Sequence, residues 1–307
     1  MALHYPIVMF QKIIQDNLLV QFPVTVEIDK ELGRGGQGCV YRGTYDGGRL
    51  CAVKNFWRIK DFRQELNNLS CVRTVRGCIE AIGYSDNDSG WILFPLYQSS
   101  LTQLFKTEPS GSISDIAFLD DIGTLFKTLR ALYMAGFIHL DVKPSNVLCG
   151  PEGGYCLSDF GTLAYREESF EWLCFNEYGR RGPAGWMSDV FSAGATALGT
   201  LVWKDKGPKG AQNFHNERSS EHHERDGTDK TAFFNAWNPD TGSWCLLEVV
   251  QNQLNEFSMH IPDIVAVIKG MLEQRLTMEE AVIQWEKALS NMQRLVNPQC
   301  RNTRAKS

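Results

Sequence analysis

The hydrophobic pattern of this chain changes its period near Leu101, and that change constrains the fold more than any other feature. Before Leu101, apolar and polar residues alternate from Val24 to Asp29, which is the period of a half-buried strand. After it, apolar residues recur every three to four positions from Ile122 to Tyr133, and Gly136 follows, as at the end of a helix. A small unit rich in strands is therefore expected to precede a larger helical unit.

Local patterns place further elements in the first unit. Strands are predicted at Val40–Thr44 and Arg49–Phe56, joined by the turn Asp46–Gly48. A short helix is predicted at Phe62–Val72, and a buried apolar strand at Trp91–Tyr97. The first unit is thus expected to be a small sheet with one helix.

Three segments outside these elements have patterns of their own. Apolar residues at rough helical spacing in residues 7–20 predict a short helix or docking segment. Residues 204–230 are charged, polar and nearly free of large apolar side chains, which predicts a mobile insertion. Near the end of the chain, Thr277 and Glu280 form a capping box that predicts the start of a final helix.

Composition bounds the compartment and the partners. A net charge of −5 argues against a general nucleic-acid binder, which needs a basic face. Nine scattered cysteines, without a Cys-x-x-Cys pair, favour reduced thiols over a disulfide framework. We find neither a signal peptide nor an apolar run long enough to span a bilayer. A cytoplasmic protein is expected, with the nucleus as the alternative.

A glycine-rich loop precedes the predicted strand Val40–Thr44. Its glycines are Gly33, Gly35, Gly36 and Gly38. The same Gly-x-Gly-x-x-Gly spacing opens dinucleotide-binding folds, but there the loop leads into a helix. A loop between antiparallel strands can instead lie over a triphosphate and offer its backbone N–H groups. A flexible turn that merely needs glycine is the other interpretation.

Lys54 lies near the end of the predicted strand Arg49–Phe56, on the same face as Ala52. If Ala52 faces a nucleotide base, the Lys54 ammonium faces the same cleft and can reach phosphates. Glu65 on the next helix is the expected counter-ion, and Asp61 is the alternative. A strand-end surface lysine and a solvated glutamate are the plainer interpretations.

The segment His139–Asn146 combines Asp141, Lys143 and Asn146, and Asp159-Phe160-Gly161 follows eighteen positions after Asp141. Asp141 can orient a hydroxyl or accept its proton, and Lys143 can neutralise a transferred anionic group. Asn146 and Asp159 offer the oxygen ligands that Mg²⁺ prefers. A helix–strand connection stabilised by Asx turns is the alternative, and His139 itself is expected to be a packed structural residue.

Five motifs, in this order, resemble those of the eukaryotic-type protein kinase family, serine/threonine type. They are the glycine loop, Cys51–Lys54, Glu65, His139–Asn146 and Asp159–Gly161. The resemblance implies an α+β bilobal fold with a small β-rich lobe containing one helix and a larger, mainly helical lobe. It divides the chain into an N-terminal extension, a kinase domain and a C-terminal tail, at 1–23, 24–295 and 296–307. Within the domain it implies an N-lobe, a hinge, a C-lobe and the polar insertion, at 24–94, 95–98, 99–295 and 204–230.

The resemblance also implies ATP and Mg²⁺ as cofactors, a protein substrate and roles for individual residues. Catalysis is assigned to Lys54, Glu65, Asp141 and Lys143, and the metal to Asn146 and Asp159. Nucleotide binding is assigned to Gly33, Gly35, Gly36, Gly38, Val40, Ala52, Lys54, Pro95 and Tyr97, behind the gatekeeper Phe94. Lys143, two positions after Asp141, is the serine/threonine-type arrangement.

Two later positions also resemble the family. Asp189, in the segment Ser188–Gly194, resembles the buried aspartate that begins a central helix of the larger lobe. Arg275 resembles the arginine that pairs with the glutamate closing the activation segment. The Ala-Pro-Glu triplet that usually carries this glutamate is missing, so the family's usual interval from Asp189 assigns the role to Glu177.

Two departures from the family pattern concern regulation. Leu140 stands where an arginine usually precedes the catalytic aspartate, and only eighteen positions separate Asp159 from Glu177. Both features predict activity that is not controlled by activation-loop phosphorylation, so the kinase is constitutive or controlled by a protein partner. A pseudokinase that serves as a binding or scaffold module is the first alternative. A kinase of small molecules or lipids is the second.

Overall fold

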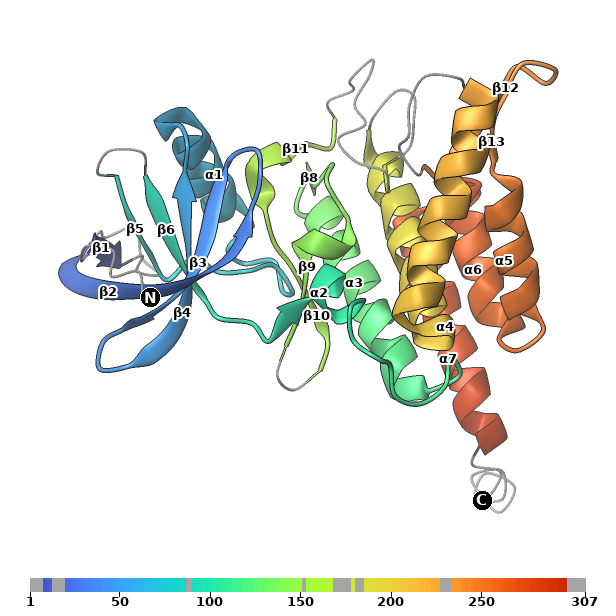
Figure 1. Ribbon diagram of the computed structural model, residues 1–307, viewed down its shortest axis with the longest axis horizontal. Coiled ribbons are helices and arrows are strands. Elements are labelled where there is room, and N and C mark those ends of the chain that lie inside the picture. Colours follow the sequence, from blue (N-terminus) through green and yellow to red (C-terminus); the bar gives the residue numbers. More distant parts are fainter. Residues whose placement is uncertain are drawn as a thin grey trace, which may run out of the picture. The chain divides into compact units, whose positions relative to one another are not determined.

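The computed structural model describes residues 8–12, 20–86, 90–150, 153–167, 178–179, 185–226 and 233–296. The chain divides into two compact units (Figure 1). The first comprises residues 1–98 and 158–163, and the second comprises residues 99–157 and 164–307. Strands dominate the first unit and helices the second, as the change of hydrophobic period predicts.

The first unit is a closed antiparallel barrel with strand order β1-β2-β3-β4-β6-β5. Its elements are β1 (Val8–Lys12), β2 (Val20–Arg34), β3 (Gly38–Tyr45), β4 (Arg49–Phe56), α1 (Ile59–Val72), β5 (Gly83–Ser85) and β6 (Trp91–Pro95). Alternate residues of these strands face inward and bury Val26, Ile28, Cys51, Val53 and Leu93 together. The turn between β3 and β4 requires left-handed backbone at Asp46 (φ 45°), Gly47 (φ 79°) and Gly48 (φ 103°), which its glycines adopt without strain.

The helix predicted at residues 7–20 is wrong where the structure describes this segment. Residues 8–12 form β1, which pairs antiparallel with β2 and with β5. Val8 lies opposite Val26, and Phe10 lies opposite Val24. A short apolar run fits both periods, so available backbone partners decide its structure, and the sequence does not reveal those partners. Because β2 begins at Val20, residues 20–23 also belong to the sheet.

The second unit is mainly helical. Its helices are α2 (Leu101–Leu104), α3 (Ile116–Met134), α4 (Trp186–Asp226), α5 (Glu248–Ser258), α6 (Pro262–Leu272) and α7 (Met278–Val296). Its short strands are β7 (Ser99–Ser100), β8 (Phe137–Ile138), β9 (Val147–Cys149), β10 (Tyr155–Leu157), β11 (Ala164–Tyr165), β12 (Asn235–Asn238) and β13 (Ser243–Leu246). The predicted capping box is confirmed, because Glu280 N donates to Thr277 Oγ1 (3.2 Å) and Thr277 N donates to Glu280 Oε2 (2.8 Å).

The mobile insertion predicted at residues 204–230 is wrong as far as Asp226. Residues 186–226 form α4, in which two helical segments meet at Gly207 (φ 66°, ψ −170°). Pro208 then lies at the start of the second segment, where a helix tolerates proline. This segment buries Phe214, Arg218 and His222, which lie four positions apart on one face. The buried stripe contains an arginine and a histidine, so hydrophobicity alone does not reveal it.

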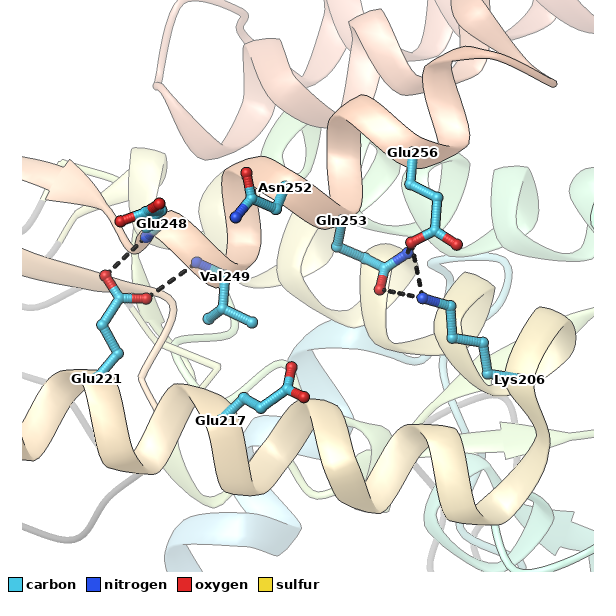
Figure 2. A pocket seen from close by; sticks show the side chains of 8 residues that line it. All are labelled: Lys206, Glu217, Glu221, Glu248, Val249, Asn252, Gln253 and Glu256. Atoms are coloured by element: carbon cyan, nitrogen blue, oxygen red, sulfur yellow. Dashed lines mark hydrogen bonds and ion pairs between the residues drawn. The ribbon is translucent and has the colours of Figure 1, made fainter.

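Polar side chains of α4 also stabilise its neighbour α5. Glu221 accepts hydrogen bonds from the backbone N–H groups of Glu248 (2.7 Å) and Val249 (2.9 Å), at the start of α5 (Figure 2). Lys206 pairs with Glu256 (2.7 Å) and donates to Gln253 (2.9 Å) near the other end of α5. The contacts of Glu221 satisfy N–H groups that a helix leaves without internal partners. Glu221 and Lys206 therefore have structural roles.

Among the described residues, no helix is long and apolar enough to cross a membrane.

The packing of α3 against α7 gives a stability prediction. Trp285 of α7 is 1% exposed, packs edge-on against Phe126 (4.9 Å between ring centroids) and donates to the Leu119 carbonyl (3.1 Å). Trp285→Ala should lower the free energy of unfolding by about 3–5 kcal/mol, because it leaves a large cavity. Ile283→Ala, at a 54% exposed position of the same helix, should cost less than about 0.5 kcal/mol. Urea denaturation of both variants measures the difference, and equal losses would contradict this packing.

Candidate active site

The first unit carries the glycine-rich loop between β2 and β3. A Cβ at Gly33, Gly35 or Gly36 would meet no atom within 4 Å, whereas a Cβ at Gly38 would lie 2.0 Å from the Asn55 carbonyl oxygen. Strand packing therefore requires glycine only at Gly38. The other three glycines leave the surface of the loop open, as close approach of a ligand to the backbone would need.

Three side chains without a predicted role make contacts at this loop, those of Trp57, Arg34 and Gln37. The Trp57 indole donates to the Gly35 carbonyl (3.1 Å), and the Arg34 guanidinium lies over the Trp57 ring (5.2 Å). The Gln37 side chain packs over Gly161, where a Cβ would lie 2.6 Å from Gln37 Oε1. Trp57 and Gln37 are themselves evident in the sequence. Their partners Gly35 and Gly161 are not, because a sequence pattern does not encode contacts between distant residues.

Lys54 is the centre of the polar cluster in the first unit. Its Nζ lies 2.5 Å from Glu65 Oε2 and 2.9 Å from Asp159 Oδ1. Burial alone would lower the pKa of Lys54, but the two carboxylates raise it above its usual value. The lysine is therefore held as an ammonium. Asp61, the alternative partner, pairs instead with Arg58 (2.6 Å).

Side chains of α1 also hold the backbone around Asp159. Gln64 donates to the Gly161 carbonyl (2.9 Å), and Asn68 donates to the Phe160 carbonyl (2.7 Å). Asp159 has left-handed backbone (φ 63°, ψ 76°), which is strained for a residue with a side chain. Gln64, Asn68 and the predicted Glu65 lie within about one turn of α1, so a single helix fixes both Lys54 and Asp159.

The remaining residues assigned to nucleotide binding lie on β3, on β4, at the end of β6 and, for Tyr97, two residues beyond it. Val40 pairs with Lys54, and Ala52 pairs with Phe94, in neighbouring positions of the sheet. Phe94 is buried, whereas Val40, Ala52, Pro95 and Tyr97 are partly exposed. Ala52 and Lys54 are two positions apart on β4 and therefore lie on the same face of the strand, as the sequence predicts.

The second unit brings together the residues of the His139–Asn146 segment. Lys143 Nζ lies 2.8 Å from Asp141 Oδ2. The Asn146 amide nitrogen donates to the Asp141 carbonyl and to Asp141 Oδ2, both at 2.9 Å. These bonds fix which end of the amide group faces Asp141. The oxygen of Asn146 is left on the other side, where Ser145 Oγ donates to it at 3.3 Å.

Asp189, at the start of α4, orients the same segment. Its two carboxylate oxygens accept the backbone N–H groups of His139 (2.6 Å) and Leu140 (2.8 Å). Burial raises the pKa of Asp189 above its usual value, although the charge of His139 and these two hydrogen bonds act against the shift. His139 is fully buried and accepts the Asp141 N–H at Nδ1 (3.2 Å), which agrees with the structural role expected from sequence.

Leu140 has left-handed backbone (φ 67°) and an almost buried side chain. It packs with Ile138, Tyr133 and Ala164. Ala164 belongs to β11, which pairs with β8 beside the catalytic segment. Leu140 thus joins the His139–Asn146 segment to β11 through apolar contacts.

The pair of Glu177 and Arg275 stays a prediction, because Glu177 lies outside the described residues. Arg275 bonds Glu273 (2.8 Å from Nε to Oε2), and its side chain is 64% exposed.

The family model described as "Protein kinase domain" matches residues 26–284. The chain belongs to the protein kinase family. The serine/threonine-protein kinase mos of Patiria pectinifera is 30% identical over 143 residues, which cover 44% of this chain and 41% of that protein. The serine/threonine-protein kinase/endoribonuclease IRE1 of Oryza sativa subsp. japonica is 26% identical over 280 residues, which cover 80% of this chain and 28% of that protein. The chain thus spans less than half the length of each of these relatives.

Among solved structures, the crystal structure of a rhoptry kinase from Toxoplasma gondii matches with a TM-score of 0.62 and 15% sequence identity. The match covers 94% of this chain and 85% of that one. At this identity the likeness is one of fold. The predicted membership of the serine/threonine type of the family and the predicted bilobal protein kinase fold are confirmed.

The role of Asp189 in this kinase can be tested by Asp189→Asn. An amide can accept only one of the two backbone N–H groups, so one buried donor loses its partner. The free energy of unfolding of the second unit should fall by about 1–3 kcal/mol. Asp205→Asn, an exposed change on the same helix, is the matched control. Urea denaturation measures both, and a variant as stable as the control would contradict the assigned role.

Proposed function

We propose that this kinase transfers the γ-phosphoryl group of ATP to serine or threonine hydroxyls of protein substrates. The observation that carries the proposal is the ion-paired Lys54, held by Glu65 and Asp159 within the first unit. A buried ammonium between two carboxylates is costly to maintain for stability alone, because an apolar residue would pack at lower desolvation cost. Its position on β4 beside the open glycine loop suits the binding of phosphates.

In the first unit, Lys54 would orient the nucleotide phosphates while Glu65 keeps the ammonium in place. Gly33, Gly35 and Gly36 would allow backbone N–H groups to approach the phosphates. Gly38 would fix the start of β3 through its close contact with Asn55, beside the base-facing residues Val40 and Ala52. The backbone groups of Pro95 and Tyr97 would bind the adenine.

In the second unit, Asp141 would position the substrate hydroxyl and receive its proton. Lys143, 2.8 Å from Asp141, would stabilise negative charge on the transferred group. Asn146 of this unit is a proposed Mg²⁺ ligand, because its hydrogen bonds turn its amide oxygen away from Asp141. Asp159 of the first unit, whose carboxylate is partly exposed, is the other proposed Mg²⁺ ligand, and the ion would neutralise charge on the phosphates.

Asp141→Asn tests the proposed role of the catalytic aspartate. The amide cannot accept the hydroxyl proton, so turnover should fall by about 10²–10⁴-fold. Asp240→Asn, in the exposed turn between β12 and β13, is the matched control and should keep the wild-type rate. Incorporation of labelled phosphate into a serine/threonine peptide library measures the rates. Magnesium-dependent ATP binding by the wild type without transfer to any substrate, itself included, would favour a pseudokinase.

We also propose that activity does not require activation-loop phosphorylation. The proposal is supported by Leu140, an apolar residue packed with Tyr133 and Ala164, which offers no cation for a phosphate at the position where the family resemblance expects an arginine. Constitutive activity or control by a protein partner would follow.

Phosphatase treatment tests this form of regulation. Because no phosphate–arginine contact forms at Leu140, the treated kinase should keep its peptide phosphorylation rate within about twofold of the untreated kinase. Mass spectrometry must confirm that phosphate has been removed. Loss of activity after complete dephosphorylation would refute the proposal while leaving the proposed chemistry intact.

A further inference from the structure

An arginine without an assigned catalytic role is almost completely buried in the second unit. Arg218, in the second segment of α4, is 2% exposed. Its guanidinium carbon lies 3.9 Å from the Phe234 ring centroid, 4.9 Å from that of Phe214 and 5.8 Å from that of Tyr178. Three aromatic faces within cation–π distance form an aromatic cage around one charge. We use the term aromatic cage for Phe214, Phe234 and Tyr178 together.

The three rings come from separate parts of the second unit. Phe214 lies on α4 one turn before Arg218, and Phe234 immediately precedes β12. Tyr178 lies between Asp159-Phe160-Gly161 and Asp189, near the end of the segment that resembles the activation segment. The cage therefore connects Tyr178 to the second segment of α4, which lies within the predicted insertion at residues 204–230.

Tyr178 has two further contacts of its own. Its ring packs against Phe234 with 5.4 Å between centroids. It also lies over Gly199 of α4, where a Cβ would come within 3.5 Å of both the ring edge and the hydroxyl. The tyrosine thus contacts both segments of α4. Arg275, which the family resemblance assigns to anchoring this region, is mostly exposed and bonded to Glu273.

We propose that Arg218 is a positioning residue, which holds Tyr178 in the aromatic cage and thereby positions Tyr178 and Gly179 for binding of the protein substrate. This proposal rests on the proposed function, because it assigns Arg218 to the protein-substrate side of that reaction. Arg218 touches neither ATP nor the reacting atoms in this scheme. Its loss should therefore weaken the binding of a peptide substrate and leave the binding of ATP unchanged.

Steady-state kinetics of the full chain test the proposal. Arg218→Met keeps an apolar stem in the cage but removes the charge, and Tyr178→Ala removes one ring. Each should raise the KM for the best peptide of a serine/threonine library about tenfold, as expected for loss of a desolvated cation–π contact. The KM for ATP should stay within about twofold of the wild-type value, because the nucleotide contacts are untouched. Tyr178→Phe keeps the ring and should retain the wild-type KM for the peptide. Glu217→Gln, an exposed neighbour of Arg218, is the matched control.

A second measurement separates failure of this proposal from failure of the proposed function. Hydrogen exchange at the backbone amides of Tyr178 and Gly179 should be faster in Arg218→Met than in the wild type, because the cage no longer holds the segment. This comparison needs no phosphoryl transfer. Unchanged exchange, or an equal rise in the KM values for peptide and ATP, would overturn the positioning role. Faster exchange in a protein that transfers no phosphate would keep the anchor and refute the kinase activity.

Discussion

Burial of a single ammonium group organises the first unit. A charge removed from water must be paired, and Lys54 finds two carboxylates from different parts of the chain. Glu65 comes from α1, which must therefore lie against β4. Asp159 comes from a segment more than a hundred residues later, which Gln64 and Asn68 of the same helix bind through its carbonyls. One buried charge thus requires a strand, a helix and a distant loop to meet.

In the second unit, the buried charge that must be compensated is negative. Asp189 is a buried carboxylate, and two backbone N–H groups donate to it. Because those N–H groups belong to His139 and Leu140, the aspartate fixes the backbone just before Asp141. Lys143 and Asn146 then bond Asp141 directly. In each unit, therefore, a buried charged residue positions the neighbouring polar groups. This residue is Lys54 in the first unit and Asp189 in the second.

Sequence reasoning recovered features that depend on local order. The change of period at Leu101, the turn at Asp46–Gly48 and the capping box at Thr277 depend on neighbouring residues, and the structure contains all three. The pair of Lys54 and Glu65 was predictable because Glu65 follows Lys54 by only eleven residues, on the next predicted helix. The failures concern contacts that a one-dimensional pattern does not encode. The second segment of α4 buries an arginine and a histidine in aromatic surroundings, so its composition resembles that of a solvated loop.

The closure of the barrel by β1 removes exposed edges from the folded sheet. An open sheet presents a row of unpaired backbone groups that can recruit a strand from another molecule. Here β1 bridges β2 and β5, so neither strand presents such an edge over the paired residues. A chain shortened to Val24 would lose β1 and the first residues of β2. The short N-terminal strand therefore covers backbone groups of β2 and β5 that an open sheet would leave unpaired.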